Sequence, residues 1–174
     1  MPRIKKYMPF QSMRIELIRE APVRKYQVYN AQSVYDVMCR EASRLDRECS
    51  WVIPLTGKNH IIGINLVSMG SLTSSVVHPR EVFKPAILAS AARVILVHNH
   101  PSGDPTPSYE DKEITKRLKD AGDILGIGVM DHVIIGNGEY YSFADKGMLN
   151  SMAWESGCKL NLKKRRGTVK PKAA

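Results

Sequence analysis

The chain has 174 residues, of which 43% are hydrophobic, and this is enough material for one core of two or three layers. Its three cysteines, Cys39, Cys49 and Cys158, are odd in number and show no C-x-x-C spacing, so the sequence favours neither a disulfide framework nor a zinc ribbon. No run of eighteen uncharged apolar residues and no apolar signal-peptide segment occurs. We therefore expect a cytoplasmic protein without a membrane span.

The net charge of +9 is concentrated at the two ends of the chain. Residues 1–25 carry seven Lys or Arg and two Glu, and residues 159–174 carry seven Lys or Arg and no acidic residue, which leaves residues 26–158 with a charge of −3. Basic ends commonly contact phosphate backbones, and runs of this kind are also ordinary solvated tails. We expect a basic N-terminal extension over 1–30, one domain over 31–158, and a basic, disordered tail after it.

Apolar periodicity and turn residues divide the chain into alternating helices and strands. The N-terminal half predicts an edge strand at 13–19, a helix opened by Ser33 with Asp36 in a capping-box position and ending near Asp46, a hairpin of strands 51–55 and 60–67 around a turn at 56–59, and a helix from Pro79 to about Ala92. The C-terminal half predicts a core strand at 94–98, a loop at 99–107, a helix opened by Ser108, a strand at 129–136, a turn at Asn137-Gly138 into a strand at 140–143, and a short helix beyond Ser142.

Helical spacing also predicts which side chains face the core. The expected buried residues are Val34, Val37, Met38 and Leu45 in the first helix, Val82, Phe83, Ala86, Ile87 and Ala91 in the second, and Ile114, Leu118, Ala121 and Leu125 in the third. The apolar run at 94–98 indicates a strand that is buried on both faces. This order of elements predicts an α/β fold, a three-layer α/β/α sandwich with helices on both faces of a mixed β-sheet.

Two of the five histidines, His98 and His100, stand where the predicted core strand ends. In an extended strand residues i and i+2 point to the same face, so the two imidazoles can meet one point beside the following loop. Asp111 lies in the first turn of the next helix, and the loop between is long enough to fold that turn back toward the histidines. Two neutral nitrogens and one carboxylate leave a fourth tetrahedral position for water, as a catalytic zinc ion requires.

Each of these residues also has an ordinary structural interpretation. A histidine at a strand end can simply form a hydrogen bond, and Ser108-x-x-Asp111 is by itself a helix capping box. Asp131-His132, in the next strand, is either a pair that orients a metal ligand or a buried hydrogen-bonded histidine, and Asn99 either orients a ligand or satisfies a turn. Together, the H-x-H pair, the loop rich in Pro and Gly, and the capped acidic turn favour metal binding.

The pattern H-x-H, seven residues, Ser, two residues, Asp resembles the motif of the JAB/JAMM (MPN) metallopeptidases, and His98, His100, Ser108 and Asp111 match it position by position. The segments HNHPSGDPTPS, SMGSLTSSVVHPREVF, DHVIIG and YYSF are similar to the RadC branch in particular, and the resemblance covers about residues 30–147. It implies a cytidine-deaminase-like fold of the JAB/MPN type, with Zn2+ held by His98, His100 and Asp111.

The same resemblance implies hydrolysis of an amide or isopeptide bond in a peptide or isopeptide substrate. In the wider JAMM pattern an upstream glutamate activates the water at the metal, and Glu48 fits that place because a residue entering the sheet can lie beside the H-x-H strand. Glu81, the third residue after His78, is the alternative and could instead cap a helix. Zinc lowers the pKa of its water toward ~7, so Glu48 could take and return a proton, and Ser108 could donate its hydroxyl to the developing oxyanion.

Other zinc hydrolases fit less well, because the chain has neither the H-x-E and P-C-x-x-C of base deaminases nor the H-E-x-x-H of zincins. The main alternative is a DNA repair or recombination accessory with a structural or vestigial metal site, since RadC-like proteins carry a DNA-repair name and the ends are basic. Where the resemblance to RadC leads us to expect a helix-hairpin-helix region before the domain, the sequence instead predicts about thirty basic, strand-like residues. A metal-dependent phosphodiesterase acting on nucleic acid is a third interpretation.

If the basic ends bind nucleic acid, removal of residues 159–174 should weaken DNA binding and reduce its salt dependence, because fewer phosphates would be neutralised. Fluorescence anisotropy with a labelled duplex, between about 50 and 200 mM salt, measures both quantities. An unchanged slope of log affinity against log salt would mean that this segment makes no phosphate contacts.

Overall fold

The computed structural model describes residues 26–70 and 77–151. The edge strand predicted at 13–19 and the basic tail predicted at 159–174 lie outside these residues. The elements in chain order are α1 (Ala31–Ala42), β1 (Cys49–Leu55), β2 (Asn65–Met69), α2 (Pro79–Leu88), β3 (Arg93–Asn99), α3 (Tyr109–Leu125), β4 (Gly128–Ile135), β5 (Tyr140–Ser142) and α4 (Met148–Ser151). None of the helices in the two described ranges is long and apolar enough to cross a membrane.

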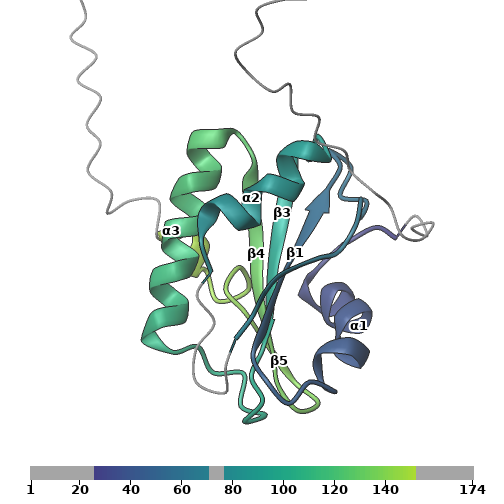
Figure 1. Cartoon of the computed structure of the whole chain (residues 1–174), viewed down its shortest axis with the longest axis vertical. Helices are drawn as coiled ribbons and strands as arrows, with labels where there is room; N and C mark the ends of the chain where they lie inside the picture. The colour runs from purple at the N-terminus through teal and green to yellow at the C-terminus, as the bar shows by residue number, and fades with distance from the viewer. Residues whose placement is uncertain (1–25, 71–76, 152–174) are drawn as a thin grey trace, which may run out of the picture.

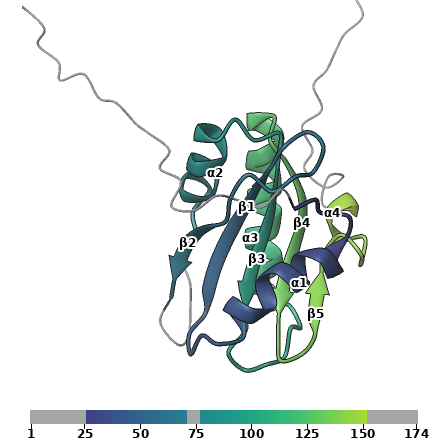
Figure 2. The ribbon, with the colours of Figure 1, turned by 90° about the vertical axis from the view of Figure 1, so that its right-hand side faces the viewer.

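The strands form one mixed sheet in the order β2-β1-β3-β4-β5. Within this sheet β3 and β4 are parallel, and the other neighbouring pairs are antiparallel. Figure 2 shows the strands side by side, with α1 lying across the face that points toward the viewer. β3 is the central strand, so its backbone is hydrogen-bonded along both edges and the end of this strand is held firmly in place.

Helices cover both faces of the sheet (Figure 1). α1 packs on one face, where Val34 and Met38 meet residues that include Ile95 and Val97 of β3. α2 and α3 pack on the opposite face, in a second cluster that includes Leu96. This arrangement confirms the predicted three-layer α/β/α sandwich, and the burial of β3 on both faces confirms its prediction as a core strand.

α1 begins earlier than predicted. Its N-cap is Asn30, whose side chain accepts a hydrogen bond from the Ser33 N–H, while the Ser33 hydroxyl accepts one from the Asn30 N–H. The prediction that Ser33 opens the helix and Asp36 completes the capping box is therefore wrong. Asn and Ser are both good cap residues, and here the reciprocal pair of hydrogen bonds favours the earlier start. The helix also ends at Ala42, before the predicted end near Asp46.

β1 and β2 pair antiparallel, as the predicted hairpin requires, but their bounds differ from the prediction. β1 begins at Cys49, two residues before the predicted start at residue 51. After the turn Ile61 forms an isolated bridge with Leu55, and the regular ladder then begins at the start of β2. The predicted strand at 60–67 is therefore displaced toward the C-terminus, because the pairing is interrupted after this bridge.

α2 ends at Leu88, before the predicted end at Ala92. Ser90 takes the left-handed conformation with φ 51°, and the amides of Ser90 and Ala91 donate hydrogen bonds to carbonyls in the last helical turn. This Schellman-type closure turns the chain back toward the sheet. It buries Ala91 as predicted but leaves Ile87 53% exposed, so the predicted burial of Ile87 is wrong.

The C-terminal end of α3 behaves in the same way. Gly126 has φ 69°, and the N–H of Ile127 donates a hydrogen bond to the carbonyl of Gly122. Ile127 is buried after this turn, whereas Leu125 is 47% exposed. The predicted burial of Leu125 is therefore wrong, because the residue that follows the helix fills the place in the core.

The remaining residues that were predicted to face the core from the helices do so, although Leu45 and Ala91 lie just after the helix ends. Those fully buried are Val34, Met38, Val82, Phe83, Ala86, Ala91 and Leu118, and those partly buried against the core are Val37, Leu45, Ile114 and Ala121. The predicted turn at Asn137-Gly138 joins β4 to β5, with Gly138 at φ 81°.

The loop after β3 is held against the turn between β4 and β5. His100 donates its N–H to the carbonyl of Ile135 at 2.9 Å, and Asn137 donates its N–H to the carbonyl of Gly103 at 2.8 Å. A Cβ atom on Gly136 would overlap the carbonyl oxygen of Gly103 and would lie 2.8 Å from Cδ of Pro105. The absence of a side chain at residue 136 thus lets the loop that carries His100 lie directly on β4.

We expect Gly136→Ala to lower the free energy of unfolding by about 1–3 kcal/mol, because the added methyl group forces two backbone segments apart. Gly128→Ala is the matched control, since a Cβ at Gly128 meets no atom within 4 Å. Urea unfolding of both variants measures the difference. Equal stability of the two variants would contradict the close packing of the loop on Gly136.

Candidate metal centre

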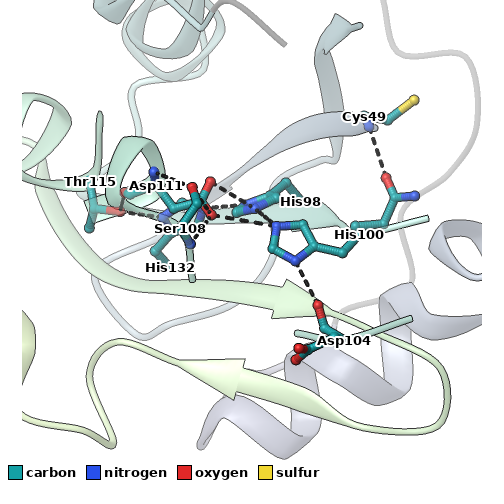
Figure 3. A network of polar contacts seen from close by, with 9 residues as sticks. Cys49, His98, His100, Asp104, Ser108, Asp111, Thr115 and His132 are labelled. Carbon is teal, nitrogen blue, oxygen red and sulfur yellow. Dashed lines mark hydrogen bonds and ion pairs between the residues drawn. The ribbon is translucent and has the colours of Figure 1, made fainter. Parts of the chain in front are cut away.

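Three side chains meet at the end of β3. His98 is the penultimate residue of the central strand β3, His100 is the first residue after that strand, and Asp111 is the third residue of α3. Nε2 of His98 lies 3.0 Å from Nε2 of His100 and 3.2 Å from Oδ1 of Asp111, and Nε2 of His100 lies 3.5 Å from Oδ2 of Asp111. Figure 3 shows the three side chains pointing toward one another. The structure thus brings together the three residues that the sequence predicted as ligands.

The spacing of these donor atoms fits a small divalent cation. A tetrahedral zinc ion with bonds of about 2.0–2.1 Å separates its ligand atoms by about 3.3 Å. The three donor-to-donor distances here are 3.0, 3.2 and 3.5 Å, which bracket that value. Among the described residues, these three form the group of His, Cys, Asp and Glu side chains that could hold a metal ion, and their ligand atoms lie within 4.8 Å of one another. The donor set, two imidazoles and a carboxylate, is one that zinc accepts.

Asp111 is fixed in place by the cap of α3. Its Oδ2 accepts hydrogen bonds from the backbone N–H and the hydroxyl of Ser108, both at 2.7 Å, and the Ser108 hydroxyl oxygen accepts one from the Asp111 N–H. The capping box and the metal ligand are therefore compatible interpretations of the same residue. The Ser108 hydroxyl donates its hydrogen to Asp111. Donation from Ser108 to a substrate oxyanion therefore stays a prediction, and it requires the hydroxyl to break its hydrogen bond with Asp111.

The protonation of the cluster follows from its contacts. Burial alone would raise the pKa of the Asp111 carboxyl, but hydrogen bonds with His100 and His98 hold this pKa well below its ordinary range. The hydrogen bond with Asp111 in turn raises the pKa of His100. The carboxylate is therefore ionised, which is the form that binds a cation.

His132 and Thr115 extend the cluster into the interior. Nδ1 of His98 lies 2.8 Å from Nε2 of His132, and Nδ1 of His132 lies 2.6 Å from Oγ1 of Thr115. His132 stacks on Phe143 with ring centroids 5.1 Å apart, and burial lowers the pKa of His132 well below its ordinary value. The sequence left open whether His132 orients a metal ligand or is a buried hydrogen-bonded histidine, and it gave no reason to select Thr115. The one signal for Thr115 was its position four residues after Asp111, which places the two side chains on the same face of α3.

The outer nitrogen of His100 and the side chain of Asn99 are also engaged. Nδ1 of His100 lies 2.7 Å from the carbonyl oxygen of Asp104. Buried Asn99 accepts a hydrogen bond from the Cys49 N–H at 2.8 Å and donates one to the carbonyl of Arg47 at 3.1 Å. Since Asn99 holds the residues on both sides of position 48, it ties the start of β1 to the end of β3.

A cavity of about 630 Å3 opens beside the cluster. Glu48 lines it together with His98, His100 and Asp111. Glu81 lines a different surface pocket and forms an ion pair with Arg80 at 3.2 Å. Of the two glutamates that the sequence left open as general base, the structure thus places Glu48 in the cavity of the cluster and Glu81 outside it.

The remaining wall of this cavity is largely apolar. Residues that contribute to it are Trp51, Val67, Val77, Val82, Leu96, Val97, Ile114 and Leu118. Its polar lining comprises histidines, serines and the carboxylates of Glu48, Glu110 and Asp111, and the described lining contains no Lys or Arg. The arrangement can therefore hold a cation between His98, His100 and Asp111 and a partly apolar ligand against the rest of the wall.

Comparison with known proteins agrees with this fold. The family model described as the RadC-like JAB domain matches residues 28–148, which include every strand of the sheet and all the residues of the cluster. The chain belongs to the RadC family.

Curated relatives in this family come from several bacteria. A UPF0758 protein of Symbiobacterium thermophilum is 51% identical over 129 residues, which are 74% of this chain and 55% of the relative. A UPF0758 protein of Pelobacter propionicus is 58% identical over 118 residues, 68% of this chain and 52% of the relative. One of Geotalea uraniireducens is 61% identical over 95 residues, 55% of this chain and 42% of the relative. The chain spans about half the length of the curated relatives it matches.

Proposed function

We propose that this RadC-family chain is a zinc-dependent hydrolase that cleaves an amide or isopeptide bond. One observation carries the proposal: the donor atoms of His98, His100 and Asp111 converge at the end of a cavity that Glu48 also lines. Three protein ligands leave one position of a tetrahedral ion open, and this open position is the mark of catalytic rather than structural zinc sites.

His98, His100 and Asp111 would hold the ion. When bound, zinc would supply Lewis-acid catalysis and make a coordinated water more acidic. Glu48 would take a proton from the attacking water and return it to the leaving nitrogen, which a partly exposed carboxylate in the same cavity can do. The Ser108 hydroxyl would stabilise the developing oxyanion by turning its hydrogen bond from Oδ2 of Asp111 to the substrate oxygen.

The charge of the cavity favours an amide over a phosphodiester substrate. Apart from Asp111, which would be a metal ligand, the carboxylates of Glu48 and Glu110 contribute to the described lining, which contains no Lys or Arg. A phosphodiester carries a negative charge that this lining would repel, whereas an amide is neutral. The apolar wall further suits a peptide with an apolar side chain near the cleaved bond.

A nucleic-acid partner remains a second proposal, and a different observation supports it. The two ends of the chain are strongly basic, whereas the domain between them has a net charge of −3. If nucleic acid binds, the basic ends rather than the cavity are the expected contact. A repair or recombination accessory built in this way could keep the metal site without using it in catalysis, and the expected cytoplasmic location is compatible with either proposal.

We expect Glu48→Gln to retain zinc and to lose hydrolysis by about 10²–10⁴-fold, because the amide cannot take up the proton. Glu81→Gln is the matched control, since Glu81 lies outside the cavity. The measurement is turnover on a panel of fluorogenic peptides, isopeptide-linked conjugates and phosphodiesters, together with zinc content. Full activity of Glu48→Gln, or an equal loss in Glu81→Gln, would exclude Glu48 as the general base. Cleavage confined to phosphodiesters would exclude the proposed bond class.

A further inference from the structure

A continuous line of buried hydrogen bonds joins the two ends of the metal cluster through the protein interior. It runs from His98 on β3 to His132 on β4 and to Thr115 on α3, and it ends at the backbone carbonyl of Asp111. The successive distances are 2.8, 2.6 and 2.5 Å. His98 is 3% exposed, His132 5% and Thr115 0%, so water is excluded from most of this line. Figure 3 shows Thr115 and His132 beside His98 and Asp111.

The direction of the hydrogen bonds is fixed at the Thr115 end. The carbonyl of Asp111 can only accept, so the single hydroxyl hydrogen of Thr115 is donated to it. The Thr115 oxygen is then available only as an acceptor. The hydrogen between Thr115 and His132 must therefore be carried by Nδ1 of His132.

The same reasoning continues to His98. A neutral imidazole carries one N–H, so Nε2 of His132 has a lone pair and accepts the hydrogen on Nδ1 of His98. With its hydrogen on Nδ1, a neutral His98 has its lone pair on Nε2. That atom is the one that faces His100 and Asp111. The interior of the protein thus dictates which nitrogen of His98 is free to bind a cation.

We propose that Thr115 and His132 are positioning residues that hold His98 in the Nδ1–H tautomer, so that its Nε2 lone pair is directed at the metal position. The inference rests on the proposed metal site. His100 reaches the same tautomer more simply, because its Nδ1 lies against the carbonyl of Asp104. For His98 the hydrogen-bonded line ends at the main chain of Asp111, so the tautomer of one ligand depends on the placement of another.

Thr115→Val tests this inference, because valine keeps the shape of threonine and removes its hydroxyl. We expect zinc affinity to fall by about 10–100-fold, the usual effect of losing a group that orients a metal ligand. Thr115→Ser restores the hydroxyl and should bind zinc within about threefold of the native chain, on the same physical ground. Chelator competition measures the affinity, and thermal unfolding of the zinc-free samples measures the stability of the fold separately.

The tautomer itself can be observed in the full-length chain. Long-range 1H–15N spectra of histidine-labelled protein, before and after zinc removal, distinguish Nδ1–H from Nε2–H in His98. We expect Nδ1–H in the native chain and in Thr115→Ser, and a mixture or Nε2–H in Thr115→Val. An Nε2–H tautomer in the native chain, or native zinc affinity in Thr115→Val, would overturn the inference.

This design separates the inference from the proposed function. If the native chain binds no zinc, the proposed hydrolase fails, while the spectra of the native chain still decide the tautomer. If Thr115→Val does not fold, the native spectra and the Thr115→Ser affinity decide the question. If the native chain binds zinc and Thr115→Val binds it equally well, the positioning role fails while the metal site stands.

Discussion

The crowding of electron pairs at the end of β3 is the constraint on which the rest of the structure depends. Two imidazole Nε2 atoms lie 3.0 Å apart, and a carboxylate oxygen lies 3.2 Å from one of them. Atoms with lone pairs repel one another at this distance unless a proton or a cation lies between them. The surrounding structure nevertheless holds them there: β3 is bonded on both edges, the loop lies on Gly136, and the cap of α3 fixes Asp111. Such fixed crowding is what a preformed cation site requires.

The two faces of the sheet have different roles around that site. The face with α1 is an apolar cluster that stabilises the sheet. The face with α2 and α3 carries the cavity, so the same side of the sheet that provides His98 also provides most of the apolar wall. Asn99 joins these regions by bonding the backbone on both sides of Glu48. The carboxylate proposed as general base therefore belongs to the residue just before β1, and the start of β1 is tied to the ligand strand.

The sequence predicts those features that depend on neighbours along the chain. It does not predict helix ends, burial or contacts that depend on residues distant in the sequence. The layer order, the buried strand and the candidate ligands follow from periodicity and from a motif that lies within one strand, one loop and one helical turn. Asn30 and Ser33 are both good caps, so local propensity could not choose between them. The exposure of Ile87 follows from a left-handed Ser90, which apolar spacing cannot reveal. His132 meets His98 across 34 residues, so no spacing rule predicts the contact.

Zinc content of the purified full-length chain tests the central claim most directly. Mass spectrometry of the native chain, of Asp111→Ala and of Glu110→Ala, each purified without chelator, compares loss of the ligand with loss of the neighbouring carboxylate. The metal centre described above predicts about one zinc ion per chain in the native protein and in Glu110→Ala, and far less in Asp111→Ala. Absence of zinc from a correctly folded native chain, or equal zinc in native and Asp111→Ala, would contradict it and would leave Ser108 and Asp111 as a helix cap alone.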